Sequence, residues 1–516
     1  MTLTAALLTA AVAVASTPDP GIHSALELVY QGHVDTALAR LRAAASARPG
    51  DPMAAYALAL ALCWKVEQRA ETEELDGELQ AAAMDAVARA DALLQRDPAD
   101  VDALFARGAA QGALSRYHLF RLHRGDAARS AVRMREDLTR VRALDPRHRD
   151  ARFGLGLYDY YADVLPRAAK VIRFLARMPG GDRRRGLASI DEAANRSELH
   201  RTEARVQLYE IYAFYEDRPG LAMDQLDDLR QRYPTHPLWA LKAIEHLRAR
   251  LGAYGEAVAV GRAILARADG GEPNYEGPWV PALARLEMGH ALVSDLRPRE
   301  ARSLLLAVVA DGMPGNAAGA ARARCLLGAS LEMDGDRPAA LAHYRIAAGG
   351  ADGEWSERAR AALSAPIPVA RVRALAALGA ARRREASHGE GAVSLARDAL
   401  SLWPESMEAA LTLVDDRLAA GDLPGAREVW PRADPGQAAE TPWLRPWEWL
   451  LAAERDDLEG RREEAVQQYK KVLKDTLRRP DFEQRAEAGI KGPFAPTARP
   501  GRFPRLRAIS TGLSTT

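Results

Sequence analysis

Residues 449–475 read WLLAAERDDLEGRREEAVQQYKKVLKD. After the opening tryptophan come Gly460, Ala465, Tyr469 and Val472, the last four separated by five, four and three residues. Residues three and four apart share one helix face, glycine permits a tight turn, and alanine lets two helices approach closely. The stretch therefore predicts a helical hairpin whose two helices meet at Ala465, with Tyr469 packed between them.

The same spacing recurs along much of the chain. The turn, small and bulky positions of the further copies are Gly32, Ala37 and Leu41; Asp217, Ala222 and Leu226; Gly252, Ala257 and Gly261, where glycine replaces the bulky residue; Leu296, Ala301 and Leu305; Gly335, Ala340 and Tyr344; and Gly421, Ala426 and Trp430. This pattern resembles the tetratricopeptide (TPR) repeat, a unit of about 34 residues. The resemblance implies an all-α fold, a TPR-like α-solenoid built as a right-handed superhelix of antiparallel helix hairpins.

The composition excludes several classes of protein. The net charge of the 516 residues is +1, so the overall charge does not indicate a nucleic-acid-binding protein. The two cysteines, Cys63 and Cys325, lie far apart in apolar helical patterns, which favours buried thiols over a disulfide framework. No sequence pattern typical of a metal site, a nucleotide loop or a catalytic nucleophile is present, and we expect neither a cofactor nor an enzymatic activity.

The N-terminus carries features of an export signal. Leu3 to Val14 is an uninterrupted run of apolar and small residues, and Ala13-Val14-Ala15 fits a cleavage site. The run is too short to span a bilayer. Residues 1–15 are therefore predicted to be a signal peptide of an exported, periplasmic protein. The run has no preceding Lys or Arg, so a cytoplasmic protein with an uncleaved N-terminus remains the alternative.

A break is predicted in the repeat array. Ala365-Pro366-Ile367-Pro368 cannot continue a helix, because proline lacks the amide hydrogen and restricts the residue before it. We therefore expect an N-terminal array over residues 20–364 and a C-terminal array over 369–488. Residues 489–516 are rich in Gly, Pro and Arg, which predicts a disordered basic tail that could contact an anionic surface weakly.

One segment departs from the repeat pattern. Residues 154–194 contain the string GLGLYDYY and, further on, GGDRRRGL. This segment resembles an uncharacterised bacterial TPR family with a GGDR-x-x-GL motif. Tyr158 and Tyr161 either pack against other aromatic side chains to brace an irregular repeat, or line a ligand pocket flanked by Arg183 and Arg184. Tyrosine and arginine are enriched at binding hot spots, which keeps the second interpretation open.

The TPR resemblance also implies which residues face the groove. In TPR arrays, four positions of each first helix line the concave side. They correspond here to Phe214, Trp239, Lys242, His246, His290, Arg322, Glu332, Asp415, Trp447 and Glu454. Some TPR domains clamp chaperone C-termini with several groove Asn and Lys residues, but none of the three Asn residues of this chain maps to the groove. We therefore expect a scaffold or adaptor that binds a protein or peptide of another kind, acting in the cell envelope. A cytoplasmic TPR regulator or assembly factor is the alternative, and a small-ligand binder at residues 153–215 is a third hypothesis.

Overall fold

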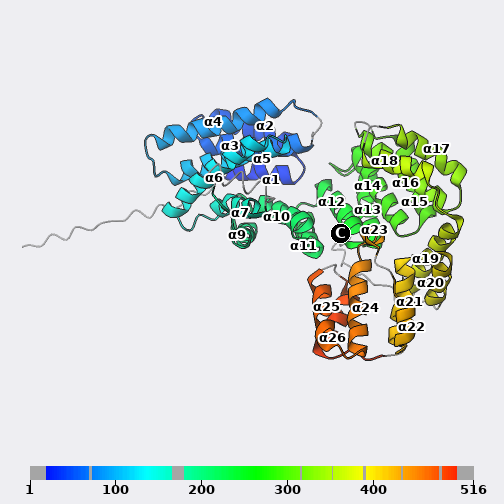
Figure 1. Cartoon of the computed structure of the whole chain (residues 1–516). Coiled ribbons are helices and arrows are strands. Elements are labelled where there is room, and N and C mark those ends of the chain that lie inside the picture. The colour runs from blue at the N-terminus through cyan, green and yellow to red at the C-terminus, as the bar shows by residue number, and fades with distance from the viewer. Residues whose placement is uncertain are drawn as a thin grey trace, which may run out of the picture. The chain divides into compact units, whose positions relative to one another are not determined.

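The protein is built of helix hairpins that follow one another along the chain (Figure 1). The structure, a computed structural model, describes residues 19–68, 72–164, 179–313, 316–350, 353–386, 391–431, 434–475 and 479–496. The described residues contain helices and no strand. The predicted signal peptide and the part of the predicted tail after residue 496 lie outside them.

Contacts divide the chain into two compact units, residues 1–208 and residues 209–516. The helices of unit 1 are α1 Pro20–Tyr30, α2 Val34–Ala47, α3 Pro52–Gln68, α4 Asp76–Leu94, α5 Val101–Phe120, α6 Arg124–Leu144, α7 Asp150–Val164 and α9 Arg183–Arg196, followed by α10 Arg201–Glu210, which runs across the boundary. Consecutive helices pack as pairs, α1 with α2, α3 with α4, α5 with α6 and α7 with α9.

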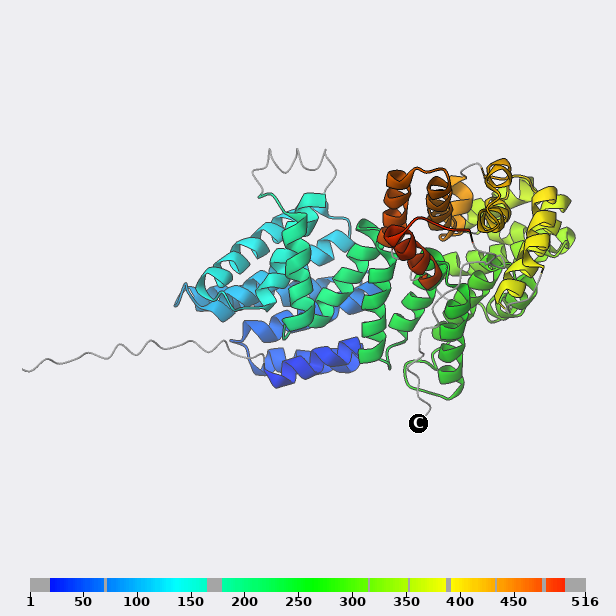
Figure 2. The same ribbon diagram turned by 90° about the horizontal axis from the view of Figure 1, so that it is seen from below.

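Unit 2 continues the pairing (Figure 2). Its helices are η1 Ile211–Tyr215, α11 Pro219–Arg232, α12 Pro237–His246, η2 Leu247–Leu251, α13 Tyr254–Asp269, α14 Trp279–Ser294, α15 Pro298–Asp311, α16 Ala317–Met333, α17 Arg337–Ala348, α18 Glu354–Ser364, α19 Val369–Ala386, α20 Ala392–Leu402, α21 Met407–Ala419, α22 Leu423–Glu428, α23 Pro435–Glu440, α24 Leu444–Leu458, α25 Arg462–Asp475 and α26 Pro480–Lys491. The segments η1 and η2 are single π-helical turns that extend α10 and α12. This order of packed hairpins is a TPR-like α-solenoid, as the sequence predicts.

The turn position of the repeat has a positive φ wherever the sequence places it. Gly460 has φ +77°, in the left-handed region that glycine enters without strain. The template positions occupied by Leu296 and Asp217 have φ +56° and +49°. The turn geometry is therefore kept even where the residue disfavours it, which shows that the predicted repeat register is correct there.

The small position of the repeat is the point of closest approach in each hairpin. The residues predicted there are fully buried, with no exposed surface, at Ala37, Ala222, Ala257, Ala301, Ala340, Ala426 and Ala465. The bulky partner Tyr469 is also buried. Both cysteines are buried, as expected, and burial raises the pKa of the Cys63 thiol to about 12.

Two hairpins of unit 2 each contain a polar cluster of the same kind, in which an acidic residue binds a tyrosine, an arginine and a backbone N–H. Glu332 accepts hydrogen bonds from Tyr344 Oη at 3.0 Å and from the backbone N–H of Ile367 at 2.9 Å, and it pairs with Arg337 at 2.8 Å. This cluster joins the end of α16 to the chain that follows α18. Glu332 is buried, so the prediction that it lines an open groove does not hold for this side chain.

The equivalent cluster forms around Asp457, at the end of α24. Asp457 accepts from Tyr469 Oη at 3.0 Å and from the backbone N–H of Phe494 at 2.8 Å, and it pairs with Arg462 at 2.9 Å. Phe494 lies in the segment predicted to begin a disordered tail. The start of that segment is instead held in the fold, because α26 extends to Lys491 and Asp457 binds the backbone beyond it.

The predicted break is visible as the end of α18 at Ser364 and the start of α19 at Val369. The flanking helices nevertheless belong to one compact unit. Arg382 of α19 donates to the backbone oxygen of Ser294 at 2.9 Å, and Arg479 donates to that of Gly252 at 3.4 Å. The division into an N-terminal and a C-terminal array stays a prediction.

Candidate partner-binding face

The first helices of consecutive hairpins contact one another through polar and aromatic side chains. In unit 2 these helices are η1, which continues α10, then α12 with η2, α14 and α16; α18, which packs on α16 and α17, follows them. We call the side chains that connect them the first-helix row of unit 2: Tyr209, Phe214, Lys242, His246, Arg248, Glu287, His290, Arg322 and Trp355. Five of the ten groove residues predicted from the sequence belong to this row.

The row begins with an aromatic group around Tyr209. The Tyr209 ring lies 6.2 Å from that of Phe214 and 5.7 Å from that of His246, both edge to face, and Lys242 Nζ lies 5.7 Å above it. His246 is buried, with Nε2 2.8 Å from the backbone oxygen of Pro219. Phe214 is 68% exposed and sits in the π-helical turn η1. Single π-helical turns often occur at functional sites, so Phe214 is the best-placed apolar anchor of the row.

The row continues as a cluster with an excess of positive charge. Glu287 of α14 accepts from Arg322 of α16 at 2.5 and 2.8 Å, and from Arg248 Nε at 3.1 Å. Two guanidinium groups thus share one carboxylate, which leaves a charge of +1. Burial, opposed by Glu287 and assisted by Arg322, lowers the pKa of Arg248 below its usual value. Glu245 also acts on Arg248 in the same sense as Glu287, so these two carboxylates offset the burial of this arginine in part.

His290 adds a neutral donor to the cluster. Its Nδ1 lies 2.7 Å from Arg322 Nη2, and because a guanidinium can only donate, Nδ1 accepts and the ring proton lies on Nε2. Burial and the nearby charges of Arg248 and Arg322 hold the pKa of His290 well below its usual value. Within the described residues, Nε2 of His290 and both terminal nitrogens of Arg248 have no hydrogen-bond partner. These nitrogens are therefore hydrogen-bond donors that the cluster itself does not use.

Trp355 of α18 forms the aromatic end of the row. Its ring lies 5.3 Å from that of His290, nearly perpendicular, while Arg322 and Arg358 lie over it at 5.5 and 5.0 Å. Sequence reasoning missed Arg248, Glu287 and Trp355. Arg248 falls in η2, which adds residues to the helix and shifts the groove positions out of the regular spacing.

The pH dependence of stability tests the state of His290. Unfolded, this histidine gains a proton near pH 6.5, whereas folded it stays neutral well below that pH. The unfolded state then binds more protons, so the free energy of unfolding should fall as the pH drops below 6.5, by at most about 1.4 kcal/mol per pH unit. His290→Gln keeps an acceptor for Arg322 and does not titrate. Its urea midpoint should fall less between pH 7 and pH 5 than that of the wild type.

The control for this experiment is His23→Gln, which replaces an exposed histidine of α1. Its pH dependence should match that of the wild type. Identical pH profiles for His290→Gln and the wild type would show that His290 does not stay neutral in the fold.

The remaining predicted groove residues lie in the interior of unit 2. Trp239 and Trp447 are both fully buried, so the expectation that they line an open face is wrong for these side chains. Trp447 Nε1 donates to Asp415 at 3.3 Å, and Arg485 of α26 binds Asp415 at 2.8 Å and Glu454 at 2.7 Å. The groove positions are covered here because α21, α24 and α26 pack against one another. Arg485 was not identified from the sequence.

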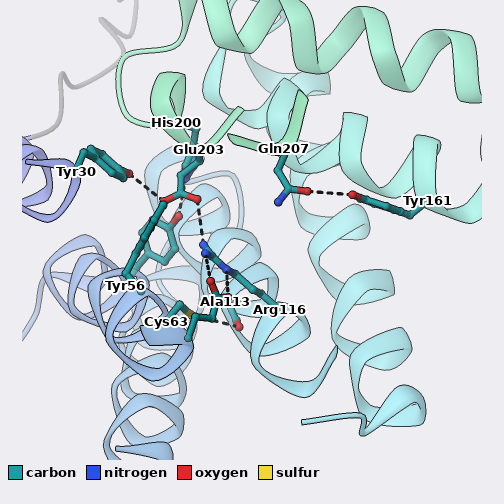
Figure 3. Close-up of polar contacts among 11 residues, drawn as sticks. Tyr30, Tyr56, Cys63, Ala113, Arg116, Tyr161, His200, Glu203 and Gln207 are labelled. Carbon is teal, nitrogen blue, oxygen red and sulfur yellow. Dashed lines mark hydrogen bonds and ion pairs between the residues drawn. The ribbon is translucent and has the colours of Figure 1, made fainter. Parts of the chain in front are cut away.

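The two tyrosines of the possible ligand cluster each have a structural contact in unit 1. Tyr158 is buried and donates to the backbone oxygen of Pro179 at 2.9 Å, and Arg135 lies 5.4 Å above its ring. Tyr161 Oη donates to Gln207 at 3.2 Å (Figure 3). Arg183 and Arg184 are exposed at the start of α9. A role of these four residues in ligand binding stays a prediction.

Unit 1 also contains a cavity of about 650 Å³ with carboxylates in its wall. Several of these carboxylates accept hydrogen bonds from backbone N–H groups. Asp100 accepts from Ala103 N at 2.9 Å, and Asp150 accepts from Leu199 N at 3.0 Å and His200 N at 2.8 Å. Although burial opposes it, contacts with His200 and the backbone lower the pKa of Asp150 to about 2. The acidic wall thus has a structural explanation.

The described part of the chain holds no group of three or more His, Cys, Asp or Glu side chains suited to a metal ion. None of the described helices combines the length and hydropathy required to cross a bilayer.

Comparison with known proteins gives no family assignment. No protein-family model and no curated protein matches the chain. Among solved structures, the chain is similar to the TPR domain of P58(IPK), with 17% identity, a TM-score of 0.19 and coverage of 83% of this chain and 96% of that chain. It is also similar to the structure of Naa15/Naa10 bound to HypK-THB, with 13% identity, a TM-score of 0.18 and coverage of 91% and 78%. At these TM-scores neither likeness carries weight, and the fold assignment rests on the helix hairpins themselves.

Proposed function

We propose that this protein is a non-enzymatic scaffold that binds a protein or peptide along the first-helix row of unit 2. The observation that carries the proposal concerns Arg248 and His290. Within the described residues, donor nitrogens of both have no hydrogen-bond partner, and they belong to a cluster whose two arginines share one carboxylate. Surplus positive charge favours a partner segment with an acidic residue. The exposed Phe214 ring offers an apolar anchor on the same row.

The row suits an extended or helical segment better than a small molecule. Its side chains come from α10 with η1, α12 with η2, α14, α16 and α18, so contacts are spread along the stack. Stacked repeats create surfaces that are long in one direction, and such surfaces engage peptides and helices. The alternative ligand cluster around Tyr158 has the weaker support, because its tyrosines are already hydrogen-bonded within unit 1.

The setting we propose is the bacterial cell envelope, and its support is the apolar N-terminal run with an A-x-A site. The alternative is a cytoplasmic regulator or assembly factor. N-terminal sequencing of the mature chain separates the two, because a chain starting at Ser16 has been exported and one retaining Leu3 has not.

The scaffold proposal predicts a position-specific contact in cells. A photoreactive phenylalanine analogue at Phe214 should give one or two discrete protein adducts on illumination. The same analogue at Ile346, which is 55% exposed on α17, a second helix, should give none of these adducts. The same set of adducts at both positions, or none at Phe214, would count against the first-helix row as the binding face.

A further inference from the structure

A helix of the chain itself lies across the first helices of unit 1. The carboxylate of Glu203, in the first turn of α10, accepts hydrogen bonds from Trp64 Nε1 of α3 at 2.6 Å, Tyr30 Oη of α1 at 3.1 Å and Arg116 of α5 at 3.0 Å (Figure 3). Three donors from three successive first helices thus converge on one side chain. Glu203 is 3% exposed, so this carboxylate is enclosed by its donors.

The donors are held in place without help from Glu203. Arg116 binds Glu67 with two hydrogen bonds, of 2.6 and 2.7 Å, and its guanidinium lies 5.3 Å above the Trp64 ring. The Tyr30 ring meets Trp64 edge to face at 5.8 Å. Burial alone would lower the pKa of Arg116, but Glu67 and Glu203 outweigh it and hold that pKa well above its usual value. The arginine would still be paired if Glu203 left.

A second contact three residues earlier fixes the direction of α10. His200 Nε2 lies 2.5 Å from Tyr56 Oη of α3, and its ring lies 5.8 Å from Phe105 of α5 and 5.2 Å from Phe153 of α7. His200 directly precedes α10 and contacts α3 and α5, the helices that also supply two of the donors to Glu203. A carboxylate in the first turn is also favoured by the helix dipole.

The charges around Arg116 are balanced without Glu203. With Glu203 bound, Arg116 faces two carboxylates, whereas without it the Arg116–Glu67 pair is neutral. Removing a buried ionic partner is usually costly because it leaves an unpaired charge behind. Removing α10 would leave no such charge on the first helices, because Arg116 would remain paired with Glu67. Glu203 and the preceding His200 make the polar contacts at the start of α10, and Ala204 and Leu208 further along the helix are buried as well.

We propose that the face formed by Tyr30, Tyr56, Trp64 and Arg116 is a binding site for an acidic helix, and that α10 occupies it as an internal ligand. The recognised feature is a histidine followed three residues later by a glutamate at the start of a helix. A partner helix with this feature would compete with α10 for the face. This site belongs to unit 1, whereas the row proposed in unit 2 begins with Tyr209 at the other end of α10.

The test uses the full-length chain and a labelled synthetic peptide of residues 197–212. Glu203→Gln keeps the shape of the side chain and removes its charge. Hydrogen exchange of the α10 amides should rise at least tenfold, with exchange of α3 to α6 unchanged. The peptide should bind the Glu203→Gln chain at least tenfold more tightly than the wild type, whose site is filled. The peptide with Gln at position 203 should bind that chain at least tenfold more weakly than the peptide with Glu.

The matched control is Asp191→Asn, which removes an exposed carboxylate of α9 and should change neither readout. Should Glu203→Gln fail to fold, Tyr30→Phe removes a single hydroxyl donor and should still raise α10 exchange several-fold. Exchange that rises throughout unit 1 together would show α10 to be an integral part of the core. Absence of peptide binding to the Glu203→Gln chain would equally overturn the proposal.

Discussion

Replacing Arg485 by methionine is expected to destabilise unit 2 by about 3–5 kcal/mol, because the change leaves two buried carboxylates without their common cation. Arg485 pairs with Asp415 at 2.8 Å and Glu454 at 2.7 Å, and these carboxylates are 8% and 2% exposed. Although burial opposes it, the two carboxylates raise the pKa of Arg485 well above its usual value. The measurement is the free energy of unfolding in urea at pH 7.

Arg299→Met is the matched control. Arg299 pairs with Asp334 at 3.0 Å, but its side chain is 82% exposed, and exposed ion pairs contribute less than about 1 kcal/mol. Its urea midpoint should remain close to that of the wild type. Equal effects of the two substitutions would mean that Asp415 and Glu454 are not enclosed as the structure shows.

Replacing Ala465 by arginine is expected to disrupt the hairpin of α24 and α25. Ala465 has no exposed surface, so the larger side chain must displace its neighbours and bury a charge. Overpacking alone costs about 1–3 kcal/mol, and the unpaired charge adds to it. We expect a loss of several kcal/mol in the free energy of unfolding. Gln467→Arg, at an exposed position of the same helix, should change it little.

The outcome at Ala465 also tests the repeat register. An Ala465→Arg protein that melts at the wild-type temperature would place this position on the surface and shift the register of the last hairpin.

The fold could be predicted from the sequence because its decisive positions are local. The turn residue, the alanine five residues later and the bulky residue four after that are fixed by the geometry of one hairpin. The hairpin of α5 and α6 follows the same rule with Leu122 at the turn, where φ is +61°, and Ala127 buried at the small position. This copy was not identified from the sequence, although Leu296 was recognised at the turn position of another copy.

The candidate face was less predictable, because it depends on contacts between hairpins. Whether Trp447 is exposed depends on how α24 meets its neighbours, and nothing in residues 444–458 specifies this. The charged clusters illustrate the same limit. Asp415 and Glu454 were assigned to a groove as separate charges, but in the structure both bind Arg485, which lies in a later helix. Glu203 likewise meets its donors across 87 to 173 residues of sequence.

One spacing signal was present and can be read from the sequence in retrospect. In both hairpin-ending clusters an acidic residue precedes an arginine by five residues and a tyrosine by twelve, at Glu332, Arg337 and Tyr344 and again at Asp457, Arg462 and Tyr469. A residue five positions later lies beyond the turn, at the start of the second helix. A residue twelve positions later lies on the second helix, where its side chain reaches back to the end of the first helix. This pattern identifies buried acidic residues that a groove assignment alone treats as exposed.

The central claim, a partner bound through the first-helix row of unit 2, is tested most directly by affinity. The partner segment identified by crosslinking at position 214 is synthesised as a peptide. It is then titrated calorimetrically into the wild type, the Arg248→Gln variant and the control variant Arg299→Gln. The account predicts binding to the wild type and the control, and at least tenfold weaker binding, about 1.4 kcal/mol, to Arg248→Gln. Equal affinity for all three proteins would contradict a role for the Arg248 cluster, and no binding to the wild type would contradict the scaffold account itself.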